Sequence, residues 1–467
     1  MRAGTSETVI TPPAGAPTLG TIQRSTGVHD DLFARALVLN DGNQRVAIVC
    51  LDLIGMDFAM VDEIRDAIRH RTGITSILLN CSHTHSSPFT IPWSVLGWRW
   101  VAGAGKKWRD RLAPILGEMV ADAEATATDC VLRVGRASVQ IGLNRRFETE
   151  QGVVMKPNPA GITVPWVDVL RVDRLDGTPA AVLFSHAAHP VIIHGASKLI
   201  SADFPGYAVQ KLKSLFGGNV LAMFAQGCGA QINGDPLRGG FAAAEHAGSL
   251  LAEAAFQAAC NSKPLGKQTF TITSVSAGIP LAPLPTRSEC ARVLKEAEDR
   301  LAKLWSRTFS DEQMWDLQDQ IDIGGAKSQS QDDVQPMDGQ PWWLTDNVLC
   351  LRDLMKKVEA GEGGALRFDA QMVRVGDEWS LLATSHELFA EYQHWFDANA
   401  PTGKKMMWAY TNGCESYIPT NEELQRDGYE TASFPAMDSA ALKYRHRRAI
   451  GRGAENDVIE ALRSLWA

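Results

Sequence analysis

Strand-like and helix-like segments alternate along the first half of this chain. Residues 46–53 form an apolar run of strand length, and residues 59–70 then carry apolar side chains at helical spacing. The same order recurs further along, ending with an apolar run at 220–225 and an alanine-rich helical segment at 242–260. Such alternation is typical of proteins whose helices pack on the faces of a β-sheet. We therefore predict an α/β fold with a layered core and a mixed sheet.

Residues 285–345 interrupt this pattern. A charged helix is expected at 289–304, and the sequence that follows is polar and has little periodicity. Four tryptophans lie in this stretch, namely Trp305, Trp315, Trp342 and Trp343. A long irregular insert with large apolar rings is typical of a lid over a pocket or of an oligomer contact. The alternative is a peripheral subdomain with its own small core. Strands return after about residue 365, with helices expected near 387–398, 438–449 and 455–465. We therefore expect one catalytic unit over 1–467 that carries a helical, Trp-bearing insert at 285–345.

Charge and hydropathy exclude several classes of partner. The chain has 467 residues and a net charge of −8, which argues against a nucleic-acid partner. No apolar run approaches the roughly 18 residues that an integral membrane segment requires. The eight cysteines are scattered, and no secretory signal is visible at the start, so we expect a cytoplasmic protein with reduced thiols. A small-molecule substrate is the expected partner, and homo-oligomerisation stays open.

Two histidines follow one of the expected strands. The apolar run at 74–79 leads into His83 and His85, and Ser86-Ser87-Pro88 then signals a turn. Side chains two residues apart on a strand point to the same side, so both imidazoles can reach one ligand. They are suited either to holding a metal ion or to capping the strand by bonding nearby backbone.

A second histidine cluster follows another strand. His186, His189 and His194 lie there, so five of the eleven histidines sit in two loops. Catalytic zinc sites use about three nitrogen or oxygen ligands and keep one position for water. An acidic ligand is still needed, and Glu387 stands at an expected junction of strand and helix. A carboxylate there also fits the alternative of a favourable charge at a helix N-terminus.

Several short motifs, in this order, resemble those of one known family. The chain is similar to the N-terminal catalytic domain of the neutral (alkaline, non-lysosomal) ceramidases, over most of its length outside 285–345. The matching stretches are Val9-Ile10-Thr11-Pro12-Pro13, Leu19-Gly20, Thr26-Gly27-Val28-His29, His83-Thr84-His85-Ser86, Asn144-Arg145, His189, Ser201-Ala202-Asp203, Glu387, Asn412-Gly413-Cys414-Glu415-Ser416-Tyr417 and Tyr429-Glu430-Thr431-Ala432-Ser433. Each motif alone is weak, but their order and spacing are specific.

The resemblance implies a ligand set for one divalent ion, zinc. The two histidines, the glutamate and the tyrosine that hold the family's zinc fall on His83, His189, Glu387 and Tyr417. Imidazoles and a carboxylate suit zinc, and a phenol oxygen can join them if the metal lowers its pKa. His85 is then free to act on the substrate or on metal-bound water.

The resemblance also implies a substrate site. Gly20, Arg145 and Tyr429 match positions that line it in the family. Arg145 or Tyr429 could donate a hydrogen bond to an oxyanion that develops during the reaction. Arg146, the next residue, fits a structural ion pair equally well.

The chain departs from the family pattern at two positions that matter for mechanism. Where the ceramidases carry Gly-Asp-Val-Ser-Pro, this chain has Gln231 and Asn233 in place of the aspartate and the serine. An asparagine has no hydroxyl to activate, although its amide can donate to an oxyanion, so attack by metal-activated water is favoured. We also expect no C-terminal immunoglobulin-like domain. The chain is thus interpreted as a divergent, non-ceramidase member of the family, and the roles of His186, His194 and Asp52 stay open.

These observations lead to one leading hypothesis for the function. The protein is expected to be a zinc-dependent hydrolase that cleaves an amide bond, N-acyl or related, of a small or amphiphilic substrate through metal-activated water. On the same metal site, a lactone or ester hydrolase is an alternative. A metal-dependent phosphoester hydrolase or lyase is a second, and a non-catalytic metal-binding or ligand-binding protein is a third.

Overall fold

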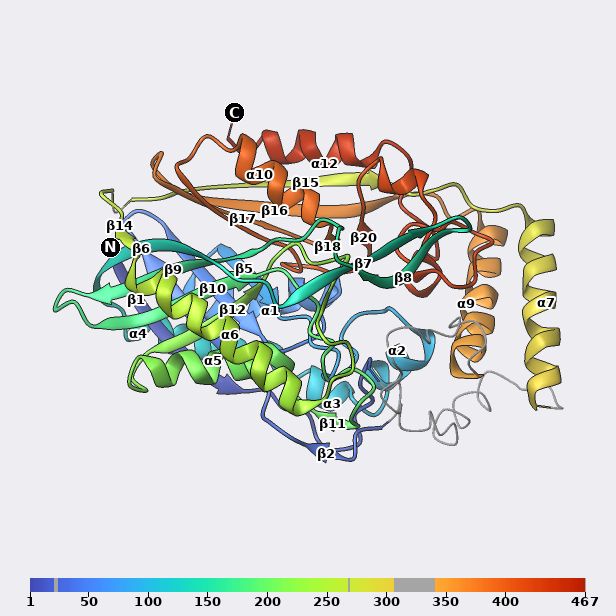
Figure 1. Ribbon diagram of the computed structural model, residues 1–467, viewed down its shortest axis with the longest axis horizontal. Coiled ribbons are helices and arrows are strands. Elements are labelled where there is room, and N and C mark those ends of the chain that lie inside the picture. Colours follow the sequence, from blue (N-terminus) through green and yellow to red (C-terminus); the bar gives the residue numbers. More distant parts are fainter. Residues whose placement is uncertain (21–23, 268, 306–340, 467) are drawn as a thin grey trace.

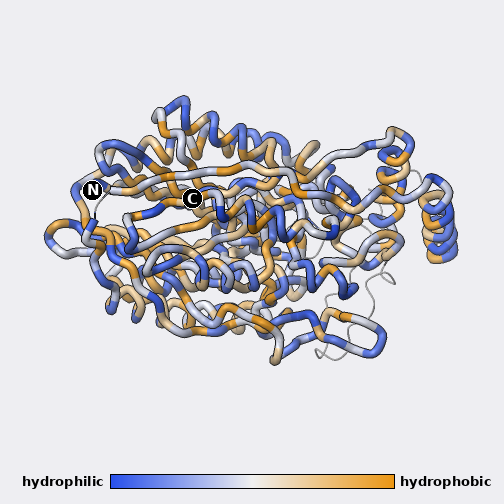
Figure 2. Tube along the Cα trace, turned by 90° about the horizontal axis from the view of Figure 1, so that it is seen from above, coloured by the Kyte–Doolittle hydropathy of each residue, from blue (hydrophilic) through white to orange (hydrophobic). Residues whose placement is uncertain are grey.

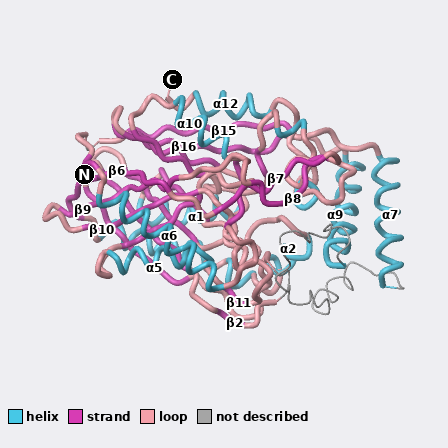
Figure 3. The backbone as a smooth tube through the Cα atoms, viewed as in Figure 1, coloured by secondary structure: helices cyan, strands magenta, loops and turns pink. Residues whose placement is uncertain are grey.

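Four layers, in the order helix, sheet, sheet and helix, make up the protein in this computed structural model (Figures 1 and 3). The structure describes residues 1–20, 24–267, 269–305 and 341–466. Strands occupy the centre, and helices cover the outer face of each sheet. The predicted α/β class with a layered core and mixed sheets is confirmed.

The larger sheet has nine strands. Its order is β12-β10-β9-β6-β1-β3-β4-β5, with β14 paired to β6 off this path. The pairs β4–β5 and β10–β12 are parallel, whereas the other ladders are antiparallel. The strands are β1 (Arg2–Val9), β3 (Phe33–Asn40), β4 (Arg45–Leu51), β5 (Ser76–Cys81), β6 (Thr128–Ser138), β9 (Trp166–Arg174), β10 (Pro179–His186), β12 (Leu221–Gln226) and β14 (Lys263–Pro264).

Two helix pairs cover the outer face of the larger sheet. They are α1 (Phe58–Thr72) with α4 (Leu112–Ala125), and α5 (Asp203–Leu215) with α6 (Phe241–Cys260). Glycines allow two of these helices to approach the strands closely. A Cβ atom on Gly4 would lie 1.8 Å from the Ala123 carbonyl oxygen of α4, and one on Gly135 would lie 2.2 Å from the Ala258 carbonyl oxygen of α6. Any larger residue at either position would therefore push the helix away from the sheet.

The second sheet lies against the inner face of the first. It has the order β15-β16-β17-β19, with bounds β15 (Thr271–Pro280), β16 (Ala365–Val375), β17 (Trp379–Thr384) and β19 (Lys404–Trp408). Alternate residues of both sheets fill the space between them, because successive side chains of a strand point to opposite faces. Leu37 and Ile48 of the first sheet and Leu381 and Trp408 of the second belong to this shared core. The outer face of the second sheet carries α10 (Ala390–Asn399) and α12 (Ala454–Arg463).

Three small sheets and several short helices complete the fold. The sheets join β13 (Ile232–Gly234), β7 (Gly142–Thr149) and β8 (Gly152–Asn158); β11 (Leu199–Ile200) and β2 (Gly27–Val28); and β18 (Glu387–Leu388) and β20 (Tyr417–Ile418). The short helices include α2 (Val95–Ala102), α3 (Lys106–Arg109), α11 (Ala440–Lys443) and a 3₁₀ turn at Glu423–Gln425. No helix in the described ranges is long and apolar enough to span a bilayer.

The predicted helix at 438–449 is much shorter in the structure. Only α11 (Ala440–Lys443) forms, because Tyr444 takes an extended conformation with ψ 155°. Arg447 then adopts a left-handed backbone with φ 59°. This irregular backbone carries Tyr444 into the candidate site described below.

The insert projects from one end of the molecule. Its described part is the pair α7 (Arg287–Trp305) and α9 (Pro341–Ala360), and the polar segment with Trp315 lies outside the described residues. The two helices share a small hydrophobic core with Leu442 of α11. Figure 2 shows that the projecting α7 is largely hydrophilic along its length. A lid or an oligomer contact at 285–345 remains a prediction.

Candidate metal centre

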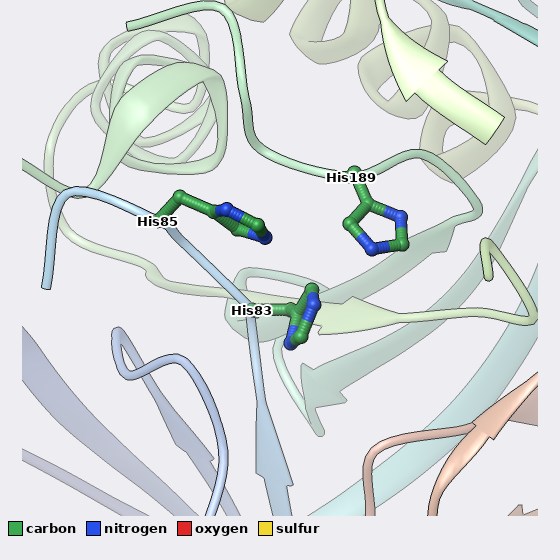
Figure 4. Close-up of side chains that lie close together, drawn as sticks. All are labelled: His83, His85 and His189. Atoms are coloured by element: carbon green, nitrogen blue, oxygen red, sulfur yellow. The ribbon is translucent and has the colours of Figure 1, made fainter. Parts of the chain in front are cut away.

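The two histidine loops meet at the ends of their strands. His83 follows β5 and His189 follows β10, and Figure 4 shows that their rings and the ring of His85 face one another. The ring centroids of His83 and His189 are 4.6 Å apart, and that of His85 lies 5.1 and 5.6 Å from them. The nitrogen atoms of all three can approach one ion. His83 has a left-handed backbone with φ 68°, a strained conformation that is frequent at functional sites.

Glu387 reaches the same point from the opposite sheet. It lies on β18 just after β17, and one of its carboxylate oxygens, Oε2, is 3.2 Å from Nε2 of His83 and 3.2 Å from Nε2 of His189. The carboxylate therefore faces the two imidazoles. Helix α10 begins only at Ala390, so the alternative of a helix N-terminal charge does not describe this side chain.

Backbone carbonyls hold the two imidazoles in one tautomer. Nδ1 of His83 donates to the Ile54 carbonyl oxygen at 2.5 Å, and Nδ1 of His189 donates to the Gly229 carbonyl oxygen at 2.8 Å. Each Nε2 is left with a lone pair that points toward Glu387. Within the described residues, Nε2 of His189 is buried and makes no hydrogen bond. This is the arrangement in which histidines bind a metal, because the second nitrogen fixes the ring.

Charge in this group matches the needs of a cation. Burial, followed by the nearby charge of Arg145, lowers the pKa of His189 to about 4, so the imidazole is neutral at pH 7. Two imidazoles and one carboxylate are a donor set that fits zinc. His83, Glu387 and Cys414 form a second group within ligand distance, although burial raises the pKa of the Cys414 thiol.

Two tyrosines that the sequence analysis missed hold the carboxylate of Glu387. The Tyr410 hydroxyl donates to Oε2 at 3.3 Å, and the Tyr444 hydroxyl donates to Oε1 in a short hydrogen bond. Burial raises the pKa of both phenols well above the usual value, so they stay protonated and act as donors. Hydrogen-bonded carboxylates of this kind are oriented for a ligand. No local sequence signal separates these two tyrosines from others in the chain.

Tyr417 lies beside Glu387 because β18 and β20 pair in parallel, with Glu387 opposite Tyr417. The Tyr417 hydroxyl accepts a hydrogen bond from Nη2 of Arg145 at 3.0 Å. Burial, followed by the charge of Glu387, raises the pKa of Tyr417 well above its ordinary value. The phenol is thus neutral without a cation, and its role as a fourth ligand remains a prediction.

Arg145 links the predicted substrate residues. Its Nε donates to Glu430 at 2.8 Å, and its Nη1 donates to Oδ1 of Asn233 at 3.0 Å. The guanidinium also lies 5.7 Å from the ring centre of Tyr429, within the range of a cation–π contact. Glu430 is the carboxylate that pairs with Arg145, and sequence reasoning missed that role. Arg146 makes the structural ion pairs expected of it, with Glu423 and Glu430 at 2.7 Å each.

Gly20 and His194 complete one wall. Nδ1 of His194 lies 3.1 Å from Nδ1 of His85, so one ring donates to the other. The Gly20 amide donates to the His85 carbonyl oxygen at 2.8 Å, and a Cβ at Gly20 would lie 3.2 Å from the His194 Cα. Nε2 of His85 is buried and has no hydrogen-bond partner in the described part of the chain. The loop that bears His194 is anchored by Asp203, whose Oδ2 accepts from the Ile193 amide at 2.9 Å.

Two cavities border this region. One of about 40 Å³ lies against Arg145 and Asn233, with Leu143, Met155 and Leu237 among its apolar walls. A larger one, of about 460 Å³, is lined by charged side chains that include Glu148, Glu422 and Arg426. None of the four predicted metal ligands lines the larger cavity. None of them lines the smaller cavity either, which meets the candidate site through Arg145 and Asn233.

Two residues whose roles stayed open lie apart from the centre. Asp52 accepts hydrogen bonds from the Arg35 guanidinium and the Phe33 amide, both at 2.9 Å, and is a buried structural partner. His186 donates from Nδ1 to the Trp166 carbonyl oxygen at 2.8 Å. Each therefore stabilises a loop or strand of the first sheet.

His186 gives a prediction for stability against pH. Burial lowers its pKa to about 4, whereas an unfolded histidine titrates near 6.5. As the pH falls below 6.5, the unfolded chain takes up the proton first, so the free energy of unfolding declines until the pH passes below about 4. We expect His186→Gln to flatten this decline by up to about 1.4 kcal/mol per pH unit. Urea unfolding between pH 7.5 and 4 measures it; equal slopes in the two proteins would contradict it.

Comparison with known proteins agrees with the resemblance seen in the sequence. Residues 19–235 match the family model of the neutral/alkaline non-lysosomal ceramidase N-terminal domain. Neutral ceramidase from Pseudomonas aeruginosa has a similar structure, with a TM-score of 0.62, 18% identity, and coverage of 96% of this chain and 72% of that one. A structure described as ceramidase complexed with C2 gives a TM-score of 0.64 at 17% identity, covering 96% and 73%. The resemblance is confirmed for residues 19–235, and the fold is confirmed over nearly the whole chain.

Proposed function

We propose that this protein is a zinc-dependent hydrolase that cleaves an amide bond in a small or amphiphilic N-acyl substrate. The family match over residues 19–235 supports a hydrolase acting on an amide. The observation that carries the metal dependence is the geometry at Glu387, where one oxygen lies 3.2 Å from Nε2 of both His83 and His189. Metal-free packing alone gives little reason to bury two imidazoles around a single carboxylate. Tyr417 is the proposed fourth ligand.

Zinc bound there would polarise the substrate carbonyl and lower the pKa of a water molecule. The protein's own groups supply the remaining interactions. Arg145 has five N–H groups, of which those facing Glu430, Asn233 and Tyr417 are engaged. Its other N–H groups and the Tyr429 hydroxyl, which bonds no described residue, are available to a developing oxyanion. Nε2 of His85 faces the two histidine ligands and can exchange a proton with the substrate or with water.

Asn233 supports attack by water over a covalent intermediate. Its Oδ1 accepts from Arg145, which leaves the amide N–H groups as donors. A carboxamide offers no hydroxyl that could be acylated, so the nucleophile has to come from elsewhere. Asn233 would then act with Arg145 and Tyr429 on the carbonyl oxygen. Gly20 would contribute backbone at the rim of the site.

The other hypotheses fit the site less well. A lactone or ester presents the same polarised carbonyl, so the bond type has to be tested directly. A phosphoester substrate would need several free cations, but Arg145 and Arg146 both pair with Glu430. A protein that only binds a metal would not need hydrogen-bond donors for an oxyanion beside the centre, such as the unbonded N–H groups of Arg145.

A substrate panel tests the proposed function. Purified protein is assayed on N-acyl amides, lactones and phosphate esters before and after removal of metal, with zinc content measured alongside. We expect amide turnover that is lost on stripping and restored by zinc. Less than about half an equivalent of zinc, not recovered on reconstitution, would refute the metal-dependent hydrolase. Faster turnover of lactones than of amides would reassign the bond.

A further inference from the structure

One guanidinium near the candidate centre has no counter-charge among the residues that the structure describes. Arg238 lies in the loop between β13 and α6 and is half-buried. Its Nε atom is buried without a hydrogen-bond partner, and no carboxylate of the described residues forms an ion pair with it. Burial, the sole influence on it, lowers the pKa of the group. A buried N–H group without an acceptor is costly, and an anionic ligand could supply the acceptor that the Arg238 Nε lacks.

The position of Arg238 connects it to the wall that carries His85. A Cβ atom on Gly195 would lie 3.5 Å from Nε of Arg238 and 3.5 Å from the Gly20 carbonyl oxygen. His194, which precedes Gly195, contacts His85 through the Nδ1 pair at 3.1 Å. Arg238 is therefore next to His194, and His194 and His85 stand between it and the proposed metal ligands. For a substrate whose amide lay at the proposed centre, the guanidinium would be the cation beyond His85 and His194 on this wall.

The backbone around Arg238 is held firmly. Its amide donates to the Val191 carbonyl oxygen at 3.2 Å, and the Gly240 amide donates to the Ile192 carbonyl oxygen at 3.0 Å. Arg238 also has a left-handed backbone with φ 60°, which is rare for a residue with a side chain and which it shares with His83. Such conformations persist where the surrounding structure fixes them, often at ligand sites. The guanidinium is thus presented from a rigid loop.

We propose that Arg238 binds a carboxylate carried by the substrate, so that the preferred substrates are N-acyl amino acids or similar acidic amides. A guanidinium binds a carboxylate through two parallel N–H···O contacts. One unpaired arginine matches a group with a single negative charge, whereas a phosphate dianion would call for more cations. This inference rests on the proposed amide hydrolysis, and it adds the chemical class of the group beyond the scissile bond.

A matched pair of substrates tests the role of Arg238. N-octanoylglycine carries the carboxylate, and N-ethyloctanamide has a methyl group in its place. For the wild-type enzyme we expect kcat/KM to favour N-octanoylglycine by about 10- to 100-fold. Arg238→Ala should raise KM for N-octanoylglycine by a similar factor, with little change in kcat. For N-ethyloctanamide we expect neither constant to change. Arg238→Lys should keep part of the preference. Arg452→Ala, which removes an exposed arginine, is the control for net charge.

Calorimetric binding to metal-stripped protein separates this inference from the proposed function. We expect N-octanoylglycine to bind wild-type protein and to bind Arg238→Ala about 10- to 100-fold more weakly. If no amide is turned over, the proposed hydrolase function is refuted. The difference in binding between wild type and Arg238→Ala would still test whether Arg238 binds the carboxylate. Equal binding to the two proteins, no binding to the wild type, or equal loss for both substrates would overturn the proposal. N-octanoyl-aminomethylphosphonate carries a phosphonate in place of the carboxylate. If it binds more tightly than N-octanoylglycine, and if Arg238→Ala weakens that binding, the assignment of a carboxylate is wrong.

Discussion

Replacing His83 by alanine is expected to abolish metal binding and to lower amide turnover by about a thousandfold or more. The substitution removes one of two imidazoles whose Nε2 atoms lie 3.2 Å from the Glu387 carboxylate. It also leaves that carboxylate with one fewer partner. A site reduced to His189 and Glu387 would hold zinc weakly, because the remaining ligands are too few to complete its usual coordination.

Elemental analysis and turnover measured on the same preparation check this result. The matched control is His394→Ala, which removes an exposed histidine whose ring bonds the Thr163 carbonyl oxygen. We expect the control to keep wild-type zinc content and activity. The metal assignment is wrong if the His83 variant turns over substrate at the wild-type rate, or if it keeps a full equivalent of zinc.

Replacing Lys443 by methionine is expected to cost about 3–5 kcal/mol of unfolding free energy. Lys443 at the end of α11 and Asp346 in α9 are both fully buried, and Nζ lies 2.7 Å from Oδ2. The ammonium group also lies 4.1 Å from the ring centre of Trp343. Removing the cation takes away the buried charge that lies 2.7 Å from the Asp346 carboxylate, and loss of this pairing accounts for most of the expected effect.

Denaturant unfolding of a short variant series tests the origin of this effect. The double variant Lys443→Met with Asp346→Asn should recover most of the loss, because no uncompensated charge remains and the amide can still accept from Ser94, whose hydroxyl donates to Oδ1 at 2.8 Å. Lys295→Met, at an exposed pair with Asp299 within α7, should change stability by less than about 0.5 kcal/mol. A Lys443→Met protein as stable as the wild type would show that the ion pair is dispensable.

The class of fold could be predicted because it depends on local periodicity. The runs at 46–53 and 220–225 appear as β4 and β12, and the helical pattern at 59–70 appears as α1. The packing of a second sheet against the first could not be predicted in the same way. Its strand pairing joins residues far apart in the sequence, as in β15 with β16, and alternation alone does not specify partners.

The candidate site shows a similar division. The histidines at 83, 85 and 189 could be found from the sequence because each follows a recognisable strand. Glu387 and Tyr417 could be assigned as ligands only through the family resemblance. From the sequence alone, a carboxylate just before a helix is explained more simply as a favourable charge at the helix N-terminus. Tyr444 was hidden inside a predicted helix that ends at Lys443 in the structure. Arg238 carries no local signal at all, because what marks it out is the absence of a partner among the described residues.

The pairing of β18 with β20 has a thermodynamic consequence. Glu387 and Tyr417 come from the C-terminal part of the chain, whereas His83 and His189 come from loops of the first sheet. A fragment that ended before β15 would keep all the histidines of the centre and lose its carboxylate. Any ion held by both groups favours the state in which the two sheets are docked, by an amount that grows with the logarithm of its concentration over its dissociation constant. Metal supply and assembly of the C-terminal half are therefore linked equilibria in the proposed enzyme.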